Sequence, residues 1–72
     1  MVTLGERLRE LRKSKNLKRE ELGEIIGLGP RIITFYETND RDPSLKVLIA
    51  LADYFDVSLD YLVGRSDDPA RR

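Results

Sequence analysis

Residues 18–37 decide the fold, and they read KREELGEIIGLGPRIITFYE. The first half contains apolar residues at spacings of three and four, namely Leu22, Ile25 and Ile26. The second half continues this spacing with Ile33 and Tyr36. Such spacing lines one side of a helix with 3.6 residues per turn. We therefore predict two short helices with only a few residues between them.

The residues between these two helices predict a tight turn. Gly27 has no Cβ and suits the left-handed conformation that ends many helices. Gly29 can serve as the N-cap of the second helix, and Pro30 fits its first position, where a missing N–H costs nothing. Two helices joined by a turn of this length form a helix-turn-helix.

Capping signals predict three more helices and no strand. Thr3 and Glu6 match a capping box, and Ser44 and Ser58 are typical N-cap residues. Asn16 and Asn39 are expected in left-handed conformations after the first and third helices. The predicted core faces of the first, fourth and fifth helices contain Leu4, Leu8, Leu11, Leu45, Leu48, Leu51, Ala52, Phe55, Leu59 and Leu62. No segment alternates with a period of two, so the predicted fold class is all-α with five helices.

Composition excludes several classes of function. The 72 residues include no cysteine and no histidine, which rules out disulfides, thiolate metal sites and the usual proton shuttle. No apolar run approaches the roughly 20 residues that span a bilayer, so we expect a cytoplasmic protein without a membrane segment. No phosphate-binding glycine loop and no nucleophile–base pair occurs, so we predict neither catalysis nor a cofactor.

The charges are unevenly divided along a chain whose net charge is zero. Residues 1–41 contain nine Lys and Arg against seven Asp and Glu, a balance of +2. Residues 42–72 contain four against six, a balance of −2. A basic domain is typical of nucleic-acid binding. The helix-turn-helix therefore lies in the more basic half, although the excess is small.

The chain resembles the Cro/cI-type (XRE, lambda-repressor-like) family of helix-turn-helix DNA-binding domains. The residues that carry the resemblance are Gly5, Glu6, Arg7, Leu8, Arg9, Leu11, Arg12, Leu17, Glu21, Leu22, Gly27, Ile33, Tyr36, Glu37, Arg41, Pro43, Ser44, Leu45, Leu48, Ala52, Val57, Ser58, Leu59, Asp60, Leu62, Val63 and Gly64. The resemblance covers roughly residues 3–65. It implies a compact five-helix domain over residues 1–65, with the helix-turn-helix at helices two and three. Residues 66–72, SDDPARR, have no apolar anchor, and we expect a flexible tail there.

The resemblance also implies a function and a set of site residues. The family regulates transcription, typically as repressors that bind an inverted-repeat operator in double-stranded DNA as homodimers. The implied base-contacting residues are Pro30, Arg31, Thr34 and Phe35. The implied phosphate-contacting residues are Arg12, Lys18, Arg19, Thr38, Asn39 and Arg41. Arg12 and Glu37 occupy positions that form a partly buried ion pair in the family.

The outward face of the third helix is unusually apolar for the family. Phe35 lies about 200° around the helix from Ile33 and so points away from the core, with Ile32 beside it. Arg31 can bind guanine with two hydrogen bonds, and Phe35 and Ile32 can contact thymine methyl groups. The alternatives are that Arg31 is a solvated residue that reaches only phosphate, and that Phe35 packs inward.

A second class of function is protein interaction. In this interpretation the chain is an antitoxin-like or regulatory module that binds a protein partner through the apolar face with Phe35. Further apolar residues are expected outside the core face of the fourth helix and near the fifth, where a homodimer surface is their simplest use. They are Val47, Ile49, Ala50, Tyr54, Tyr61 and Val63.

Overall fold

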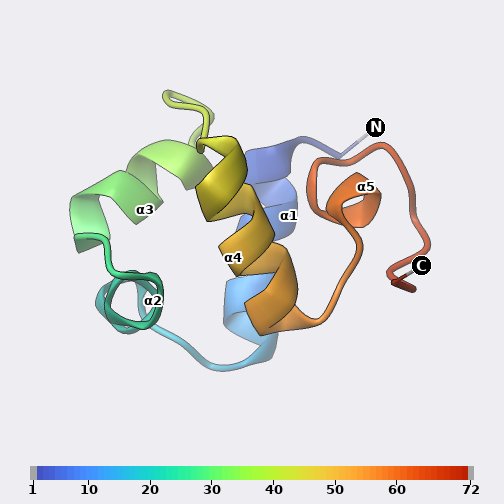
Figure 1. The fold of residues 1–72 in the computed structure, drawn as a ribbon. Coiled ribbons are helices and arrows are strands. Elements are labelled where there is room, and N and C mark those ends of the chain that lie inside the picture. Colours follow the sequence, from blue (N-terminus) through green and yellow to red (C-terminus); the bar gives the residue numbers. More distant parts are fainter. Residues whose placement is uncertain (1, 72) are drawn as a thin grey trace.

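A computed structural model describes residues 2–71, and these residues form five helices and no strand. The helices are α1 (Leu4–Ser14), α2 (Arg19–Ile26), α3 (Pro30–Glu37), α4 (Leu45–Phe55) and α5 (Leu59–Leu62). Figure 1 shows α2 and α3 at one end of the molecule, α1 and α4 in the middle, and α5 at the other end. The predicted all-α, five-helix fold class is confirmed.

Each of the five helices contributes one fully buried side chain to a single core. These side chains are Leu8, Leu22, Ile33, Leu51 and Leu62. Around them lie the buried side chains of Tyr36, Ala52, Phe55 and Val57. Burying an aliphatic side chain of this size stabilises a fold by about 1.5–3 kcal/mol. One buried residue in each helix therefore fixes how all five helices pack.

The capping residues predicted from the sequence begin the helices. The hydroxyl of Thr3 accepts a hydrogen bond from the N–H of Glu6, and the Glu6 carboxylate accepts one from the N–H of Thr3. Because the backbone N–H of Thr3 favours the ionised carboxylate, the pKa of Glu6 is lowered. Ser44 and Ser58 accept from the N–H groups of Val47 and Tyr61 in the same way.

A left-handed residue ends each of the five helices or lies in the turn that follows it. Asn16, Asn39, Asp56, Gly27 and Gly64 all have positive φ values between 56° and 84°. The positive φ expected at Asn16, Asn39 and Gly27 is therefore confirmed. Short polar side chains tolerate this region better than branched ones, and glycine tolerates it best.

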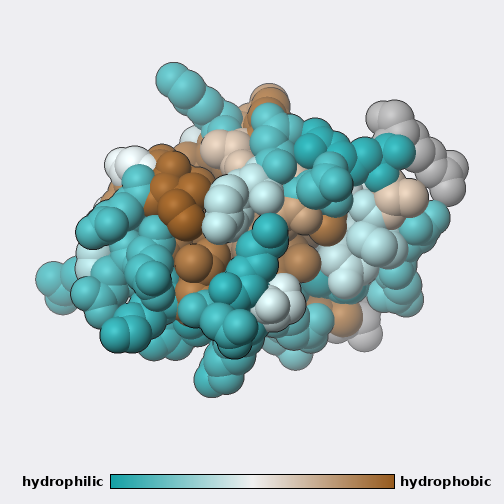
Figure 2. Space-filling view, turned by 90° about the horizontal axis from the view of Figure 1, so that it is seen from below, coloured by the Kyte–Doolittle hydropathy of each residue, from teal (hydrophilic) through white to brown (hydrophobic). Residues whose placement is uncertain are grey.

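Three apolar residues that the sequence predicts on buried faces are exposed. Ile25 is 45% exposed and Leu45 is 66% exposed, and Leu59 is exposed as well. Leu45 and Leu59 are the first residues of their helices, beyond the edge of the core. Seen from below, Figure 2 shows a mostly hydrophilic face with hydrophobic residues gathered toward the side on which α2 lies in Figure 1.

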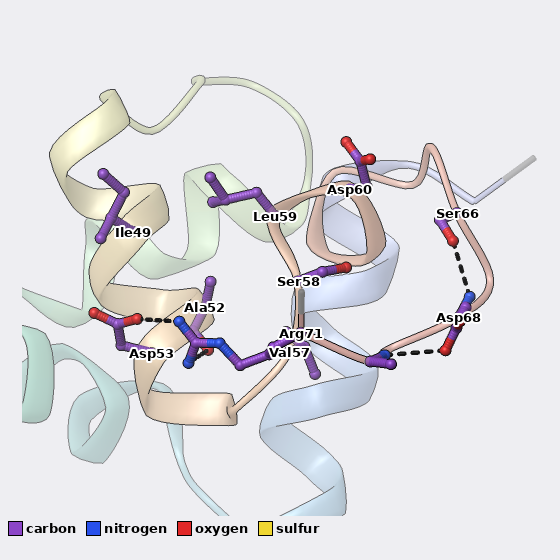
Figure 3. Close-up of a pocket in the computed structure, with 11 residues that line it drawn as sticks. Ile49, Ala52, Asp53, Val57, Ser58, Leu59, Asp60, Ser66, Asp68 and Arg71 are labelled. Atoms are coloured by element: carbon purple, nitrogen blue, oxygen red, sulfur yellow. Dashed lines mark hydrogen bonds and ion pairs between the residues drawn. The ribbon is translucent and has the colours of Figure 1, made fainter.

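Residues 66–71 are anchored by polar contacts, in contrast to the unanchored tail expected from the sequence. The guanidinium of Arg71 pairs with Asp53 and donates to the carbonyl of Ala52, and the N–H of Ser58 donates to the carbonyl of Pro69 at 3.1 Å. Figure 3 shows the segment running from Ser66 back to α4. Hydropathy alone missed these anchors because they are charges and backbone groups. The domain boundary near residue 65 stays a prediction.

A second anchor joins this segment to α1 and α5. The buried guanidinium of Arg7 lies 3.8 Å from the centre of the Tyr61 ring and pairs with Asp67 at 3.3 Å. Burial opposes the charge of Arg7, but the contacts with Tyr61 and Asp67 outweigh it, and the pKa of Arg7 is raised.

None of the helices in residues 2–71 is long and apolar enough to cross a membrane.

Candidate nucleic-acid interface

The turn between α2 and α3 depends on two glycines with different roles. Gly27 ends α2 in the left-handed conformation, with φ at 78°. The N–H of Leu28 then donates to the carbonyl of Gly23 at 2.7 Å. A Cβ on Gly23 would lie closer than 3.0 Å to the backbone oxygen of Leu28. Gly23 is therefore needed for the turn to lie against α2, and this orients α3.

Glu37 holds α1, α2 and α3 together. Its side chain is 1% exposed, and its two oxygens accept from the Nε and Nη2 of Arg12 at 2.6 and 3.2 Å. The Nε of Arg19 donates to the same carboxylate at 3.3 Å. Arg12 also donates to the carbonyl of Leu17 at 2.7 Å. The ion pair expected between Arg12 and Glu37 is present, and Arg19 joins it from α2.

These bonds leave the two arginines in different situations. The Arg12 side chain is buried, and three of its N–H groups are used inside the domain. These bonds support α3, and the phosphate contact expected of Arg12 stays a prediction. The Arg19 side chain is 42% exposed and is bound to Glu37 only through Nε. Its terminal nitrogens are therefore available to an anion outside the domain.

The starts of α2 and α3 meet around a hollow with a cavity volume of about 460 Å³. Its lining residues are Arg12, Lys18, Arg19, Glu20 and Pro30. Lys18 occupies the N-cap position of α2, and its N–H donates to the carboxylate of Glu21 at 2.8 Å. The start of a helix carries a partial positive charge that favours anions. The structure thus brings together Lys18, Arg19 and Pro30 from the expected site.

The outward face of α3 presents Arg31 and Phe35. Arg31 is exposed, and its guanidinium carbon lies 6.0 Å from the centre of the partly buried Phe35 ring. Ile32 is partly buried and packs against the core, which is consistent with the expected position at the edge of the outward face. Phe35 is not among the partly buried residues that pack against the core. This is consistent with the expectation that its ring points outward.

The loop after α3 carries the remaining expected contacts. The side chain of Asn39 accepts from the N–H of Gly5 and donates to the hydroxyl of Thr3, each at 3.0 Å. The Thr38 hydroxyl donates to the carboxylate of Asp40 at 2.6 Å. Thr38 and Asn39 thus make contacts within the domain. Arg41 is exposed, and none of the described carboxylates pairs with it.

Arg31, like Arg41, is exposed and has no carboxylate partner in the described part of the chain. Within residues 2–71 no carboxylate lies at ion-pair distance from its guanidinium. By contrast, Arg7, Arg12, Arg19 and Arg71 all have carboxylate partners. The hydroxyl of Thr34 lies 3.2 Å from the carbonyl of Pro30, to which it donates. Arg31 is therefore the strongest free hydrogen-bond donor on the outward face of α3.

Three features of this surface were not predicted from the sequence. They are the close approach at Gly5, the close approach at Gly23, and the contact of Arg19 with Glu37. A Cβ on Gly5 would lie closer than 3.0 Å to the backbone oxygens of Tyr36 and Glu37, which end α3. For the two glycines, the only signal in the sequence was a glycine inside a helical segment, which often marks close backbone packing.

The surface of α4 and α5 is chemically different from that of α2 and α3. A cavity of about 500 Å³ lies between these helices and residues 66–71. Ile49 and Leu59 lie together on one side of it, and Arg71 closes another side (Figure 3). The sequence assigned three further residues to an outer surface, but they pack partly against the core, namely Val47, Tyr54 and Tyr61.

Within residues 2–71 no group of three or more acidic residues is arranged to hold a metal ion.

Comparison with known proteins identifies the family. The helix-turn-helix family model matches residues 8–62. A curated relative, an uncharacterized HTH-type transcriptional regulator YobD of Bacillus subtilis (strain 168), is 44% identical over 64 residues. The match covers 89% of this chain and 57% of that protein. This chain therefore spans little more than half the length of that relative.

Two solved structures have a similar fold. The first is the P22 c2 repressor protein in complex with synthetic operator 9T, with a TM-score of 0.85 and 29% identity. The match covers 92% of this chain and all of that chain. The second is the restriction-modification controller protein C.AhdI from Aeromonas hydrophila, with a TM-score of 0.74 and 36% identity. That match covers 82% of this chain and 89% of the controller protein.

Proposed function

This chain belongs to the Cro/cI-type helix-turn-helix family of transcriptional regulators, and from this we propose that it is a sequence-specific repressor that binds duplex DNA through the major groove. The observation that carries the proposal is the outward face of α3, where Arg31 is exposed and has no carboxylate partner among residues 2–71. An unpaired guanidinium on a helix of this kind can bind the O6 and N7 atoms of guanine. In this proposal α3 reads base edges with Arg31 and Phe35, assisted by Pro30 and Thr34.

We propose that phosphates bind on both sides of α3. Lys18 and the terminal nitrogens of Arg19 lie at the start of α2, beside the hollow that Pro30 also lines. Arg41 lies in the loop after α3 and is exposed. Phosphate contacts set the register of a protein on DNA but carry no base information. Thr38 and Asn39 support this loop through their contacts within the domain and contribute less to phosphate binding.

We also propose that the protein acts as a homodimer on an inverted-repeat operator. The exposed apolar side chains of Ile49, Leu45 and Leu59, on α4 and α5, supply surface for such a dimer. Two domains so joined would present their α3 helices about 34–36 Å apart, one turn of DNA. The cytoplasm is the corresponding location, and the proposed role is binding rather than catalysis.

Titration of fluorescent duplex DNA with the protein, at several salt concentrations, tests this function. We first select binding sequences from a random duplex pool and then measure affinity by fluorescence anisotropy. The logarithm of the association constant is expected to fall linearly with the logarithm of the salt concentration, with a slope of roughly −0.9 for each neutralised phosphate. A pool that yields no preferred sequence would contradict sequence-specific binding.

The competing proposal is an antitoxin-like protein-binding module that uses the Phe35 side of α3. The partly exposed ring of Phe35 is the observation in its favour. Binding through an apolar ring depends little on salt. Salt-insensitive binding of a protein that is lost in Phe35→Ala, together with no binding to any duplex, would favour this second function.

A further inference from the structure

The C-terminal end of α4 carries acidic residues that the helix itself does not balance. Asp53 lies in its last turn, Asp56 is its C-cap in the left-handed conformation, and the last turn contains no basic residue. The C-terminal end of a helix carries a partial negative charge, so cations are favourable there and carboxylates are not. This end of α4 therefore attracts a cation from another part of the chain.

Arg71 supplies that cation. Its Nη2 pairs with the carboxylate of Asp53, and its Nη1 lies 3.6 Å from an oxygen of Asp56 and donates to the carbonyl of Ala52 at 3.4 Å. The hydrogen bond with Asp53 is the main reason that the pKa of Arg71 is raised. Figure 3 shows the guanidinium lying beside Asp53 and Ala52. Three acceptors thus converge on one guanidinium.

The start of α5 adds a backbone contact to this site. The N–H of Ser58, the N-cap of α5, donates to the carbonyl of Pro69 at 3.1 Å. Residues 68–71, here called the arm, are therefore bound both by a side chain and by the backbone. The groups that bind the arm are here called the seat, and they are the carboxylates of Asp53 and Asp56, the carbonyl of Ala52 and the N–H of Ser58.

The residues just before the arm are held more firmly than the arm is. The N–H of Ser66 donates to the carbonyl of Asp60 at 3.2 Å, and the buried guanidinium of Arg7 pairs with Asp67 at 3.3 Å. Separating that pair would leave a buried charge without its partner, which is strongly unfavourable. Residues 66 and 67 therefore stay on α1 and α5, and the arm is the part that can leave the domain.

The contacts of the arm can be exchanged between equal seats at little cost. The side chains of Arg71 and Asp53 are 44% and 59% exposed. Pairs this exposed are screened by water and salt, so they hold the arm weakly. An arm that leaves its own seat and enters the seat of a second copy regains every contact that it lost. Such exchange of identical elements is a low-cost route to dimers.

The seat also lies beside the surface proposed for the homodimer. A cavity of about 500 Å³ remains between the arm and helices α4 and α5, and two of its lining residues, Ile49 and Leu59, are 43% and 39% exposed. In a two-fold symmetric dimer that uses these residues, the same patch of both copies meets at the axis, so the two seats lie near each other. Four residues of extended chain reach at most about 14 Å, which is enough to cross near the axis.

Resting on the homodimer in the proposed function, we propose that the seat is a docking surface for the arm of a second copy, so that two copies exchange residues 68–71 across the dimer axis. In a single copy the arm occupies its own seat, and in the dimer the same contacts run between chains. Ile49 and Leu59 then supply the apolar part of the interface, and the arginine of each arm binds the acidic end of α4 in the other copy.

Two variants test the exchange by complementation. Arg71→Ala keeps the seat but loses the guanidinium of the arm, and the double variant Asp53→Asn with Asp56→Asn keeps the arm but loses the carboxylates of the seat. Neither variant alone can form an intact pair of arm and seat, and one such pair forms only in a dimer of the two. We expect native mass spectrometry of an equimolar mixture, with one variant isotope-labelled, to show more heterodimer than random pairing gives.

A matched control removes the effect of net charge, because the two variants also differ in charge. Arg65→Ala mixed with the double variant Glu20→Gln with Glu24→Gln carries the same charge differences and leaves arm and seat intact. The control mixture is expected to pair at random. Circular dichroism of each variant checks that the helices are retained.

The wild-type protein gives a second measurement that needs no substitution. Isotope-labelled and unlabelled copies are mixed at a concentration at which the protein is dimeric, and isotope-filtered NMR detects contacts between different chains only. We expect a nuclear Overhauser effect between the amide of Ser58 in one copy and Pro69 in the other.

The outcomes separate this exchange from the proposed DNA-binding function. Random pairing of the two arm and seat variants, or contacts between Ser58 and Pro69 within single chains only, would overturn the exchange. A protein that stays monomeric at every concentration would overturn it as well. Selection from the random duplex pool tests DNA binding separately, so a motif without exchange leaves sequence-specific binding standing, and exchange without a motif leaves the docking surface standing.

Discussion

Glu37 is the residue at which the core and the proposed DNA surface meet. Its carboxylate is almost fully buried and binds Arg12 from α1 and Arg19 from α2. The resemblance to the family predicted the first of these contacts, because both residue types occupy matching positions. It did not predict the second, because it implied a phosphate contact for Arg19 rather than a contact within the domain. How many arginines bind one buried carboxylate depends on side-chain conformation. The spacing of residues in the sequence does not specify that conformation.

Replacing this buried carboxylate by an amide is expected to destabilise the domain. Glu37→Gln keeps the shape but leaves the buried guanidinium of Arg12 without a counter-charge, a change that typically costs about 3–5 kcal/mol. A small domain has only about 5–15 kcal/mol of stability in total. Urea denaturation followed by circular dichroism measures the difference. The matched control is Glu24→Gln on the exposed side of α2, for which we expect a change within about 0.5 kcal/mol.

Equal stability of the two variants would show that the Glu37 charge is not needed to hold the three helices. The proposed dual role of Arg19, partly bound to Glu37 and partly available to phosphate, would then lose its structural basis.

At the scale of the helices, the sequence predicted starts and ends better than buried faces. Caps are local, since a serine or threonine bonds to an N–H three residues away, and so each predicted cap is present. Buried faces depend on neighbouring helices. Periodicity placed Ile25 and Leu45 on apolar sides, yet both are exposed because the core does not extend over the outer side of α2 or the start of α4.

The position of α3 against α2 should depend on Gly23 and tolerate change at Gly29. A Cβ on Gly23 would collide with the carbonyl of Leu28, whereas one on Gly29 meets nothing within 4 Å. We expect Gly23→Ala to cost about 1–3 kcal/mol, as for overpacking, and to weaken DNA binding. Gly29→Ser should be neutral or stabilising, because serine is a better N-cap than glycine. Thermal denaturation and anisotropy on one duplex measure both effects.

An equal loss of stability in both variants would contradict this account of the turn. Full stability of Gly23→Ala would show that α3 can shift away from α2 without cost.

At the scale of the whole molecule, the two ends of the domain have different chemistry. The basic side chains Lys18, Arg19, Arg31 and Arg41 lie around α2 and α3. The acidic residues of the second half include Asp53, Asp56 and Asp67, which surround the C-terminal segment and pair with Arg71 and Arg7. The uneven charge along the sequence anticipated this division. The anchoring of residues 66–71 could not be predicted, because it depends on arginines that the fold brings next to these acids.

Removing the guanidinium of Arg71 should release the C-terminal segment with little loss of stability. Its pairs with Asp53 and Asp56 are solvent-exposed, and such pairs contribute little to stability because water and salt screen them. The N–H of Ser58, which donates to the carbonyl of Pro69, should then exchange faster with deuterium. Amide hydrogen exchange by NMR measures this change. Arg65→Ala is the matched control and should leave the Ser58 amide protected, whereas unchanged exchange in Arg71→Ala would argue against the anchor.

The most direct test of the account compares the DNA sequences selected by the wild-type protein, Arg31→Ala and Arg19→Ala. We expect Arg31→Ala to lose the guanine preference at one position, worth about 1–3 kcal/mol, and to keep the rest of the motif. Arg19→Ala should keep the whole motif, bind all duplexes more weakly, and show a salt slope smaller by about one. A motif that is unchanged in Arg31→Ala would contradict the claim that the exposed face of α3 reads the bases.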